Sequence, residues 1–145
     1  MSRRKNTEPL KIARQAAVEY IDNKRFVETM ESLRPSILSR LGISTEGYLP
    51  FAYELPDRRM PVKDGKLIQE YLDRRRKKEA LEITINERLF GKQRSIASAV
   101  FIDGMKNREA ALHCDTSLST VNRARKNAYK ELADELVTQG ILSEW

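Results

Sequence analysis

Side chains that donate hydrogen bonds recur at helical spacing in the last third of the sequence. They are Thr120, Asn122, Arg123, Lys126, Asn127 and Lys130. Residues three or four positions apart share one side of an α-helix. From such a side, Arg can bond guanine twice and Asn can bond adenine twice, and a helix fits a major groove of about 12 Å. The spacing therefore predicts a helix that reads double-stranded DNA, with Ser117 and Ser119 at its start in the same contact set.

The other side of this segment is apolar, which gives the helix a face to bury. Its apolar residues are Val121, Ala124, Ala128, Leu132 and Leu136. Ser117 or Ser119 can cap the helix, because a hydroxyl accepts a hydrogen bond from a free N–H of the first turn. The basic residues lie between 123 and 130 and the acidic ones between 131 and 144, whereas charges serving only solubility would be mixed. A bundle helix with an incidental basic face remains an alternative.

Two shorter helical patterns precede this segment and complete a helix-turn-helix over about 92–136. The first has an apolar stripe that stops at a glycine, typical of a helix C-terminus, and consists of Ile96, Ala99, Val100, Phe101 and Ile102 before Gly104. The second runs from Asn107 to His113 and is followed by the turn Cys114-Asp115-Thr116. Arg94, Lys106 and Arg108 are expected to contact the phosphate backbone near this second helix.

The remaining chain must position that unit, and its periodicity predicts further helices in an all-α fold. We expect a helix at 8–22 with Thr7 as cap and Pro9 in its first turn, and two short helices between 26 and 41. An irregular connector should span 42–64, with aromatic residues that pack against the protein. A long helix should follow Asp64 and run over about 65–88, although the β-branched residues at 83–85 could also form a strand.

These elements divide the chain into three predicted parts. They are an N-terminal helical region with the connector at 1–64, a long basic helix at 65–90 and the DNA-binding domain at 91–145. The run from Arg74 to Lys78 winds around every side of the long helix, so it cannot all be buried. It is either a solvated surface or, in part, a contact for phosphate or a partner.

Composition favours a polyanionic partner and gives no support to catalysis. The 145 residues carry a formal net charge of +6, which suits phosphate binding but also occurs in small proteins for solubility reasons. Cys114 is the only cysteine and His113 the only histidine, so no zinc set exists, and neighbouring side chains on a helix point about 100° apart. No Gly-rich phosphate loop occurs. We therefore expect no enzyme activity, cofactor or metal.

Membrane insertion and export are likewise not expected. No apolar run of about 18 residues occurs. Met1 to Lys5 is basic, but charged residues follow it where a secretory signal would be apolar. The predicted location is the cytoplasm.

Residues 91–132 resemble region 4 of the sigma-70 family, which reads the −35 promoter element. Lys92-Gln93-Arg94 lies where that family often has Arg-Gln-Arg, and Asp103-Gly104-Met105 is similar to its Glu-Gly-Leu. Ser117 and Thr120-Val121 match its Ser-x-x-Thr-Val, and 123–130 matches its basic recognition helix. This sequence departs from the family at two positions. Asp115 stands where the family usually has a turn glycine, and Cys114 stands where it commonly has leucine. Asp adopts a left-handed backbone more readily than most residues.

The order of elements along the whole chain is similar to the phage late-gene regulators of the ArpU and RinA type. This resemblance implies an activator in the cytoplasm of a bacterial host that binds upstream of late genes and acts with host RNA polymerase. Helix-turn-helix proteins often read two half-sites as dimers, so a homodimer is expected. The alternative is a phage small terminase subunit, which binds packaging-site DNA and forms a large symmetric oligomer.

Overall fold

The computed structural model describes residues 2–50 and 62–142, and within these ranges every regular element is a helix. The all-α prediction is therefore confirmed. The helices are α1 (Ser2–Val18), α2 (Tyr20–Leu33), α3 (Pro35–Arg40), α4 (Val62–Ile83), α5 (Gly91–Ala97), α6 (Asn107–His113) and α7 (Leu118–Thr138). Two π-helical turns extend this set: η1 (Thr84–Arg88) continues α4, and η2 (Ser98–Ile102) continues α5.

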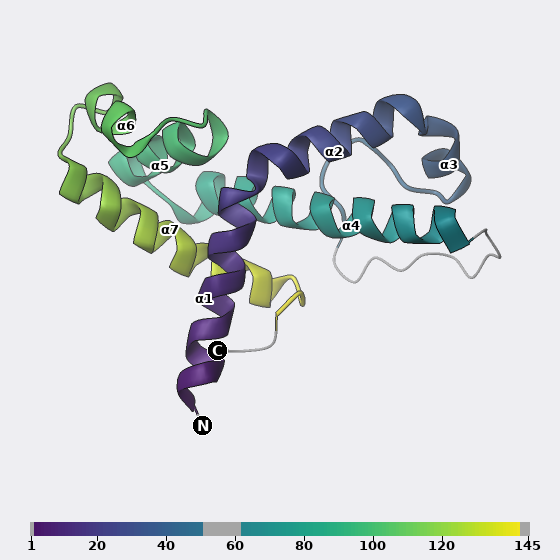
Figure 1. Ribbon diagram of the computed structural model, residues 1–145, viewed down its shortest axis with the longest axis horizontal. Coiled ribbons are helices and arrows are strands. Elements are labelled where there is room, and N and C mark those ends of the chain that lie inside the picture. Colours follow the sequence, from purple (N-terminus) through teal and green to yellow (C-terminus); the bar gives the residue numbers. More distant parts are fainter. Residues whose placement is uncertain (1, 51–61, 143–145) are drawn as a thin grey trace.

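The long helix α4 forms the axis of the molecule. In Figure 1, α2 lies along α4 with α3 at one end, α5, α6 and α7 occupy the other end, and α1 crosses between them. With η1, the helix reaches Arg88 as predicted, but it begins at Val62 rather than after Asp64. The β-branched segment is helical, not extended, and Thr84 is buried there with its hydroxyl donating to the carbonyl of Ala80 at 2.7 Å.

The N-terminal helices differ from the prediction of one helix at 8–22. Helix α1 begins at Ser2 and contains Pro9 in its interior, and the chain changes helix at Glu19. The physical reason is that α1 and the later turns of α2 serve different cores, while Tyr20 at the start of α2 still belongs to the core of α1. Ala13, Ala16 and Ala17 pack with α4 and α7, whereas Val27 and Met30 of α2 pack with α3 and the first half of α4. One straight helix could not reach both cores.

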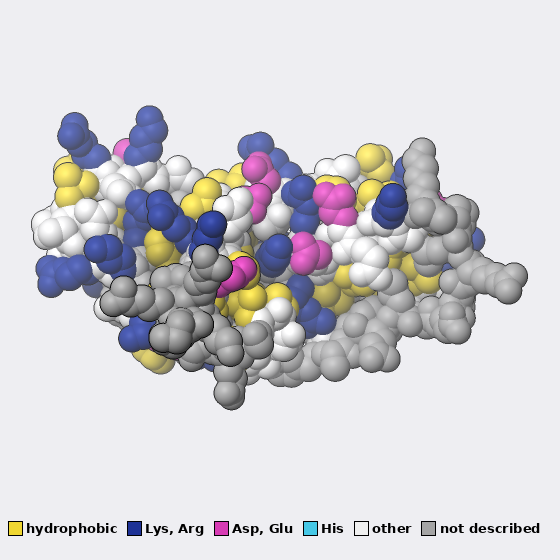
Figure 2. All heavy atoms as spheres, turned by 60° about the horizontal axis from the view of Figure 1, so that its bottom comes forward, with side chains coloured by type: hydrophobic (Ala, Val, Ile, Leu, Met, Phe, Trp, Pro, Cys, Tyr) yellow, Lys and Arg dark blue, Asp and Glu magenta, His cyan; other side chains and the backbone are white. Residues whose placement is uncertain are grey.

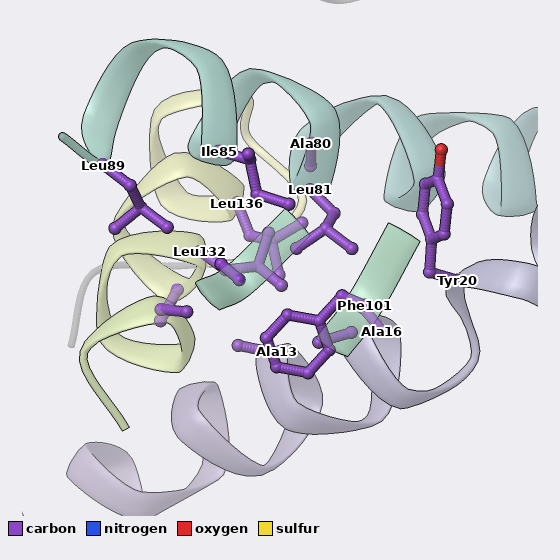
Figure 3. Packing of buried hydrophobic residues seen from close by; sticks show 14 residues of the cluster. Ala13, Ala16, Tyr20, Ala80, Leu81, Ile85, Leu89, Phe101, Leu132 and Leu136 are labelled. Atoms are coloured by element: carbon purple, nitrogen blue, oxygen red, sulfur yellow. The ribbon is translucent and has the colours of Figure 1, made fainter. Parts of the chain in front are cut away.

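The larger core joins all three predicted parts of the chain. Figure 3 shows Ala13 and Ala16 of α1 beside Phe101, close to residues from α4 and α7. Leu81, Leu132 and Leu136 are fully buried there. The small alanine side chains let α1 approach its neighbours closely, so the N-terminal helix is packed directly onto the predicted DNA-binding helix.

The connector is irregular over 42–50, as predicted, while 51–61, with Phe51 and Tyr53, lie outside the described residues. A buried ion pair holds its first half to α4. Arg75, only 2% exposed, donates from Nε to Oε2 of Glu79 at 2.7 Å and from its terminal nitrogens to the carbonyls of Ser44 and Gly47 at 2.6 and 3.0 Å. The other oxygen of Glu79 accepts the backbone N–H of Leu49 at 2.7 Å.

This pair keeps its charge in the interior. Burial by itself lowers the pKa of Arg75, but the hydrogen bond and negative charge of Glu79 more than offset this, so the pKa is raised. The guanidinium therefore remains a cation, and its donors are used by Glu79, by the Tyr71 hydroxyl and by the two connector carbonyls.

Three further members of the basic run are paired with carboxylates along the same helix, and Arg76 donates to the carbonyl of Leu49 at 3.4 Å. Ion pairs one turn apart join Arg74 to Glu70 at 3.0 Å, Lys77 to Asp73 at 3.2 Å and Lys78 to Glu82 at 3.2 Å. The five consecutive cations of α4 are thus interleaved with carboxylates before and after them. This run is a poor candidate for a phosphate-binding surface.

Glu79→Gln should lower the free energy of unfolding by about 3–5 kcal/mol, because it leaves the buried Arg75 cation uncompensated. The matched control is Glu70→Gln, which removes the partner of the more exposed Arg74 and should cost less than about 1 kcal/mol. Urea unfolding followed by circular dichroism measures both. Equal losses in the two variants would contradict the role given to the buried pair.

Candidate nucleic-acid interface

A tight turn joins α6 to α7 and fixes the angle at which α7 leaves. Asp115 has a left-handed backbone with φ of 51°. The N–H of Thr116 donates to the carbonyl of Ala111 at 2.9 Å, and the N–H of Asp115 donates to that of Leu112 at 3.2 Å. These two bonds make a Schellman motif, which satisfies the last carbonyls of α6. Asp115 thus takes the conformation that glycine most readily adopts.

Ser117 caps α7, which decides between the two predicted caps. Its Oγ accepts the backbone N–H of Thr120 at 3.2 Å. The hydroxyls of Ser119 and Thr120 each lie 3.0 Å from the same Oγ. Ser117 therefore serves first to start the helix, and Ser119, which is exposed, has the freer position at its tip.

The apolar side of α7 is buried as predicted. Val121, Ala124 and Ala128 are at most 2% exposed, and Leu132 and Leu136 are fully buried. Val121 and Ala124 form a small core with Ile96 of α5 and Ala111 of α6. The three helices are thereby held as one unit, and the side of α7 opposite this core is determined.

That opposite side presents the predicted contact residues to solvent. Asn122, Arg123, Lys126 and Lys130 are exposed, and Thr120 and Asn127 are half-buried at its edge. Figure 2 shows Lys and Arg side chains gathered over the end of the molecule that α5, α6 and α7 form. We call the exposed residues Ser119, Asn122, Arg123, Lys126 and Lys130 the α7 strip.

Helix α5 borders one edge of the α7 strip and adds two residues that the sequence did not assign to the site. Gln93 accepts a hydrogen bond from the amide of Asn127 at 2.7 Å. Lys92 and Gln93 line a shallow groove of about 220 Å³ with Thr120 and Arg123. The motif Lys92-Gln93-Arg94 is the sequence signal for both residues, although the sequence predicts a DNA contact for its arginine alone.

Arg94 lies elsewhere. Its guanidinium donates to the carbonyls of Ile85 at 3.1 Å, Leu89 at 2.9 Å and Asn86 at 2.9 Å, and it lies over the ring of Phe90. These bonds close the C-terminal end of η1. The structure therefore gives Arg94 a positioning role between α4 and α5, and it does not bring this side chain onto the α7 strip.

The two other predicted phosphate contacts lie at the start of α6. Lys106 and Arg108 are exposed there, on either side of the first residue of the helix. Asn107 between them bonds to α7: its Oδ1 accepts from Arg125 at 3.0 Å, and its amide donates to Asn122 at 3.4 Å. The start of α6 is thus fixed beside the α7 strip.

The acidic second half of α7 is used inside the protein. Arg88 of η1 bonds Oε1 of Glu135 at 2.8 Å and lies 3.8 Å from Oε1 of Glu131. It also donates to the hydroxyl of Thr138 at 3.2 Å. These contacts join the end of the long helix to α7. The two charged halves that the sequence shows in α7 therefore have different surroundings. The basic half is exposed, and the acidic half is bound to α4 through η1.

The described part of the chain contains neither a metal site nor a membrane-spanning helix. No group of three or more His, Cys, Asp or Glu side chains is placed to hold a metal ion among these residues. No described helix is long and apolar enough to span a bilayer.

No protein-family model, curated protein or solved structure matches this chain. The resemblances to sigma-70 region 4 and to the phage regulators therefore stay predictions made from the sequence.

Asp115→Gly should leave the free energy of unfolding equal or slightly higher, whereas Asp115→Ala should lower it by about 1 kcal/mol. The reason is that glycine adopts a positive φ without the steric cost that a Cβ brings. Urea unfolding measures the difference. A glycine variant less stable than the alanine variant would contradict the turn geometry.

Arg94→Ala should destabilise the fold by about 2–3 kcal/mol, because carbonyls at the end of η1 lose a charged donor. The salt dependence of DNA binding, measured while the variant is folded, should stay at the wild-type value. Lys106→Ala is the control with the opposite pattern, since its ammonium is exposed. A lower salt slope with normal stability for Arg94→Ala would restore the phosphate role.

Proposed function

We propose that this chain is a sequence-specific double-stranded DNA-binding regulator of transcription and that α7 enters the major groove. The observation that carries the proposal is the α7 strip, where exposed Arg, Asn and Lys side chains share one side of a capped, rigidly packed helix. A helix of this width fits the major groove, where its N-terminal half reaches base edges.

The charge of this end of the molecule supports a duplex as its ligand. Residues 92–130 contain eight Lys or Arg and three Asp or Glu. Each cation that neutralises a phosphate releases condensed counterions, which gives affinity that falls steeply with salt. By contrast, four of the five cations at 74–78 in α4 are paired with carboxylates of their own helix.

The side chains divide into base-reading and backbone-contacting groups. Arg123 and Asn122 lie in the first half of α7 and are the candidates for base recognition. Lys126 and Lys130 further along, and Lys106 and Arg108 at the start of α6, are the candidates for phosphate contacts. Phosphate contacts fix the register of the helix, and base contacts supply sequence preference.

The sequence resemblance supplies the finer part of the proposal. It supports a phage or prophage activator of late genes that works in the bacterial cytoplasm with host RNA polymerase, bound as a homodimer to two half-sites. In vitro transcription from a late promoter with purified host polymerase tests it, and analytical ultracentrifugation gives the oligomeric state. Stimulation by a dimer supports the activator, whereas a large ring without stimulation supports the terminase alternative.

Arg123→Ala should weaken binding to the preferred site by about 1–3 kcal/mol and leave non-specific binding nearly unchanged, because a bidentate base contact is lost. Lys126→Ala should weaken binding to all sequences alike and reduce the salt slope by about 1. Fluorescence anisotropy with upstream genomic fragments, competitor DNA and a salt titration measures both effects.

The control for charge is Arg34→Ala with Lys66→Ala. Both residues are exposed and lie at the α3 end of the molecule, away from α7 in Figure 1. This double variant should bind as the wild type does. If the folded wild-type protein binds no DNA at low salt, or if the Arg123/Lys126 double alanine binds unchanged, the proposal fails.

A further inference from the structure

Helix α1 borders the second edge of the α7 strip. A groove of about 700 Å³ lies between the two helices. Its α1 wall is made by Leu10, Lys11 and Arg14, and its α7 wall by Asn122, Arg125, Lys126 and Tyr129. The sequence predicts no ligand contact for α1.

Among the described residues, the lining of this groove combines cations with apolar surface and contains no carboxylate. Lys11 and Arg14 on one wall are exposed, as is Lys126 on the other. Leu10 and Tyr129 supply apolar surface between them, and Arg125 is fixed by bonds to the Tyr129 hydroxyl at 2.7 and 3.2 Å. A sugar-phosphate backbone has the complementary chemistry, since its phosphates are anionic and its deoxyribose rings are largely apolar.

The position of the groove matches that ligand. Asn122 and Lys126 belong both to the groove and to the α7 strip, so the groove runs directly along the edge of the strip. A helix in the major groove has a phosphate backbone on each side. Helix α1 therefore lies where one of those backbones would pass.

The packing of α1 explains how it can hold this position. Ala13, Ala16 and Ala17 are at most 1% exposed in the core shared with α7, while Lys11 and Arg14, three residues apart, turn away from that core. The two cations are thus carried by a helix whose inner side is fixed to the DNA-reading helix. Such pre-organised cations bind phosphate without ordering a flexible arm first.

We propose that Lys11 and Arg14 of α1 are a phosphate clamp for one backbone of the DNA duplex that α7 reads. The proposal rests on the proposed function and extends it to the N-terminal region. The clamp contributes affinity and orientation but no base preference, and it makes the docked position of α1 a requirement for full DNA affinity.

The test compares the full-length Lys11→Gln/Arg14→Gln double variant with the control Arg34→Gln/Lys66→Gln, which removes the same charge from exposed positions at the α3 end. Anisotropy with a preferred duplex and a scrambled one is measured over a salt series. Loss of two phosphate contacts should reduce the salt slope by about 1.8 and weaken both duplexes by the same factor. The control should keep the wild-type slope.

Hydroxyl-radical footprinting locates the effect. The clamp variant should lose protection on one backbone stretch beside the site and keep the protection that α7 gives. The charge-conserving exchange Lys11→Arg/Arg14→Lys should restore both slope and footprint. Circular dichroism and thermal unfolding should match the wild type, because the substituted side chains are exposed.

Each contrary result has a distinct meaning. If the wild type binds DNA and the clamp variant keeps its slope and footprint, the clamp is overturned and the proposed function stands. An equal loss of slope in the control also overturns the clamp, because net charge then explains the effect. Absence of DNA binding by the folded wild type overturns the proposed function and the clamp together.

Discussion

The packing of α7 is the constraint on which the rest of the structure depends, because this single helix serves both the core and the candidate interface. Leu132 and Leu136 are fully buried against α1 and α4, while Arg123, nine residues before Leu132, is exposed. A buried second half fixes the rotation of the whole helix about its axis. The residues that face solvent in the first half are therefore set by contacts made in the second.

Polar contacts of α4 and η1 extend this constraint to the rest of the chain. Arg88 bonds the acidic half of α7, and Arg94 closes the end of η1 so that α5 begins at a defined angle. At its other end α4 holds the connector through the buried pair of Arg75 and Glu79. Arg75, Arg88 and Arg94 thus position helices, whereas the cations of the α7 strip and of α1 are exposed.

The longest run of basic residues in the sequence is not the candidate interface. The most basic stretch of the chain, 74–78, is largely bound to carboxylates of its own helix, and one member is in the interior. The candidate interface instead draws cations from α1, α6 and α7, each contributing one to three. A surface that binds a duplex needs charge spread along two backbones, which separate elements supply better than one run.

The sequence by itself determined the all-α class, the helices within 91–138 and the two sides of α7. These features rest on local physics: helical periodicity, the Ser117 cap, the glycine stop at Gly104 and a turn at Asp115 that a short polar side chain allows. Only the tertiary structure decided the break at Glu19, the burial of Arg75, the position of Arg94 against backbone carbonyls and the place of α1 beside α7. The bonds of Arg94 span only five to nine residues and depend on where η1 ends. The other three features depend on which core a helix joins. That choice depends on contacts between residues far apart in the chain, which local patterns do not encode.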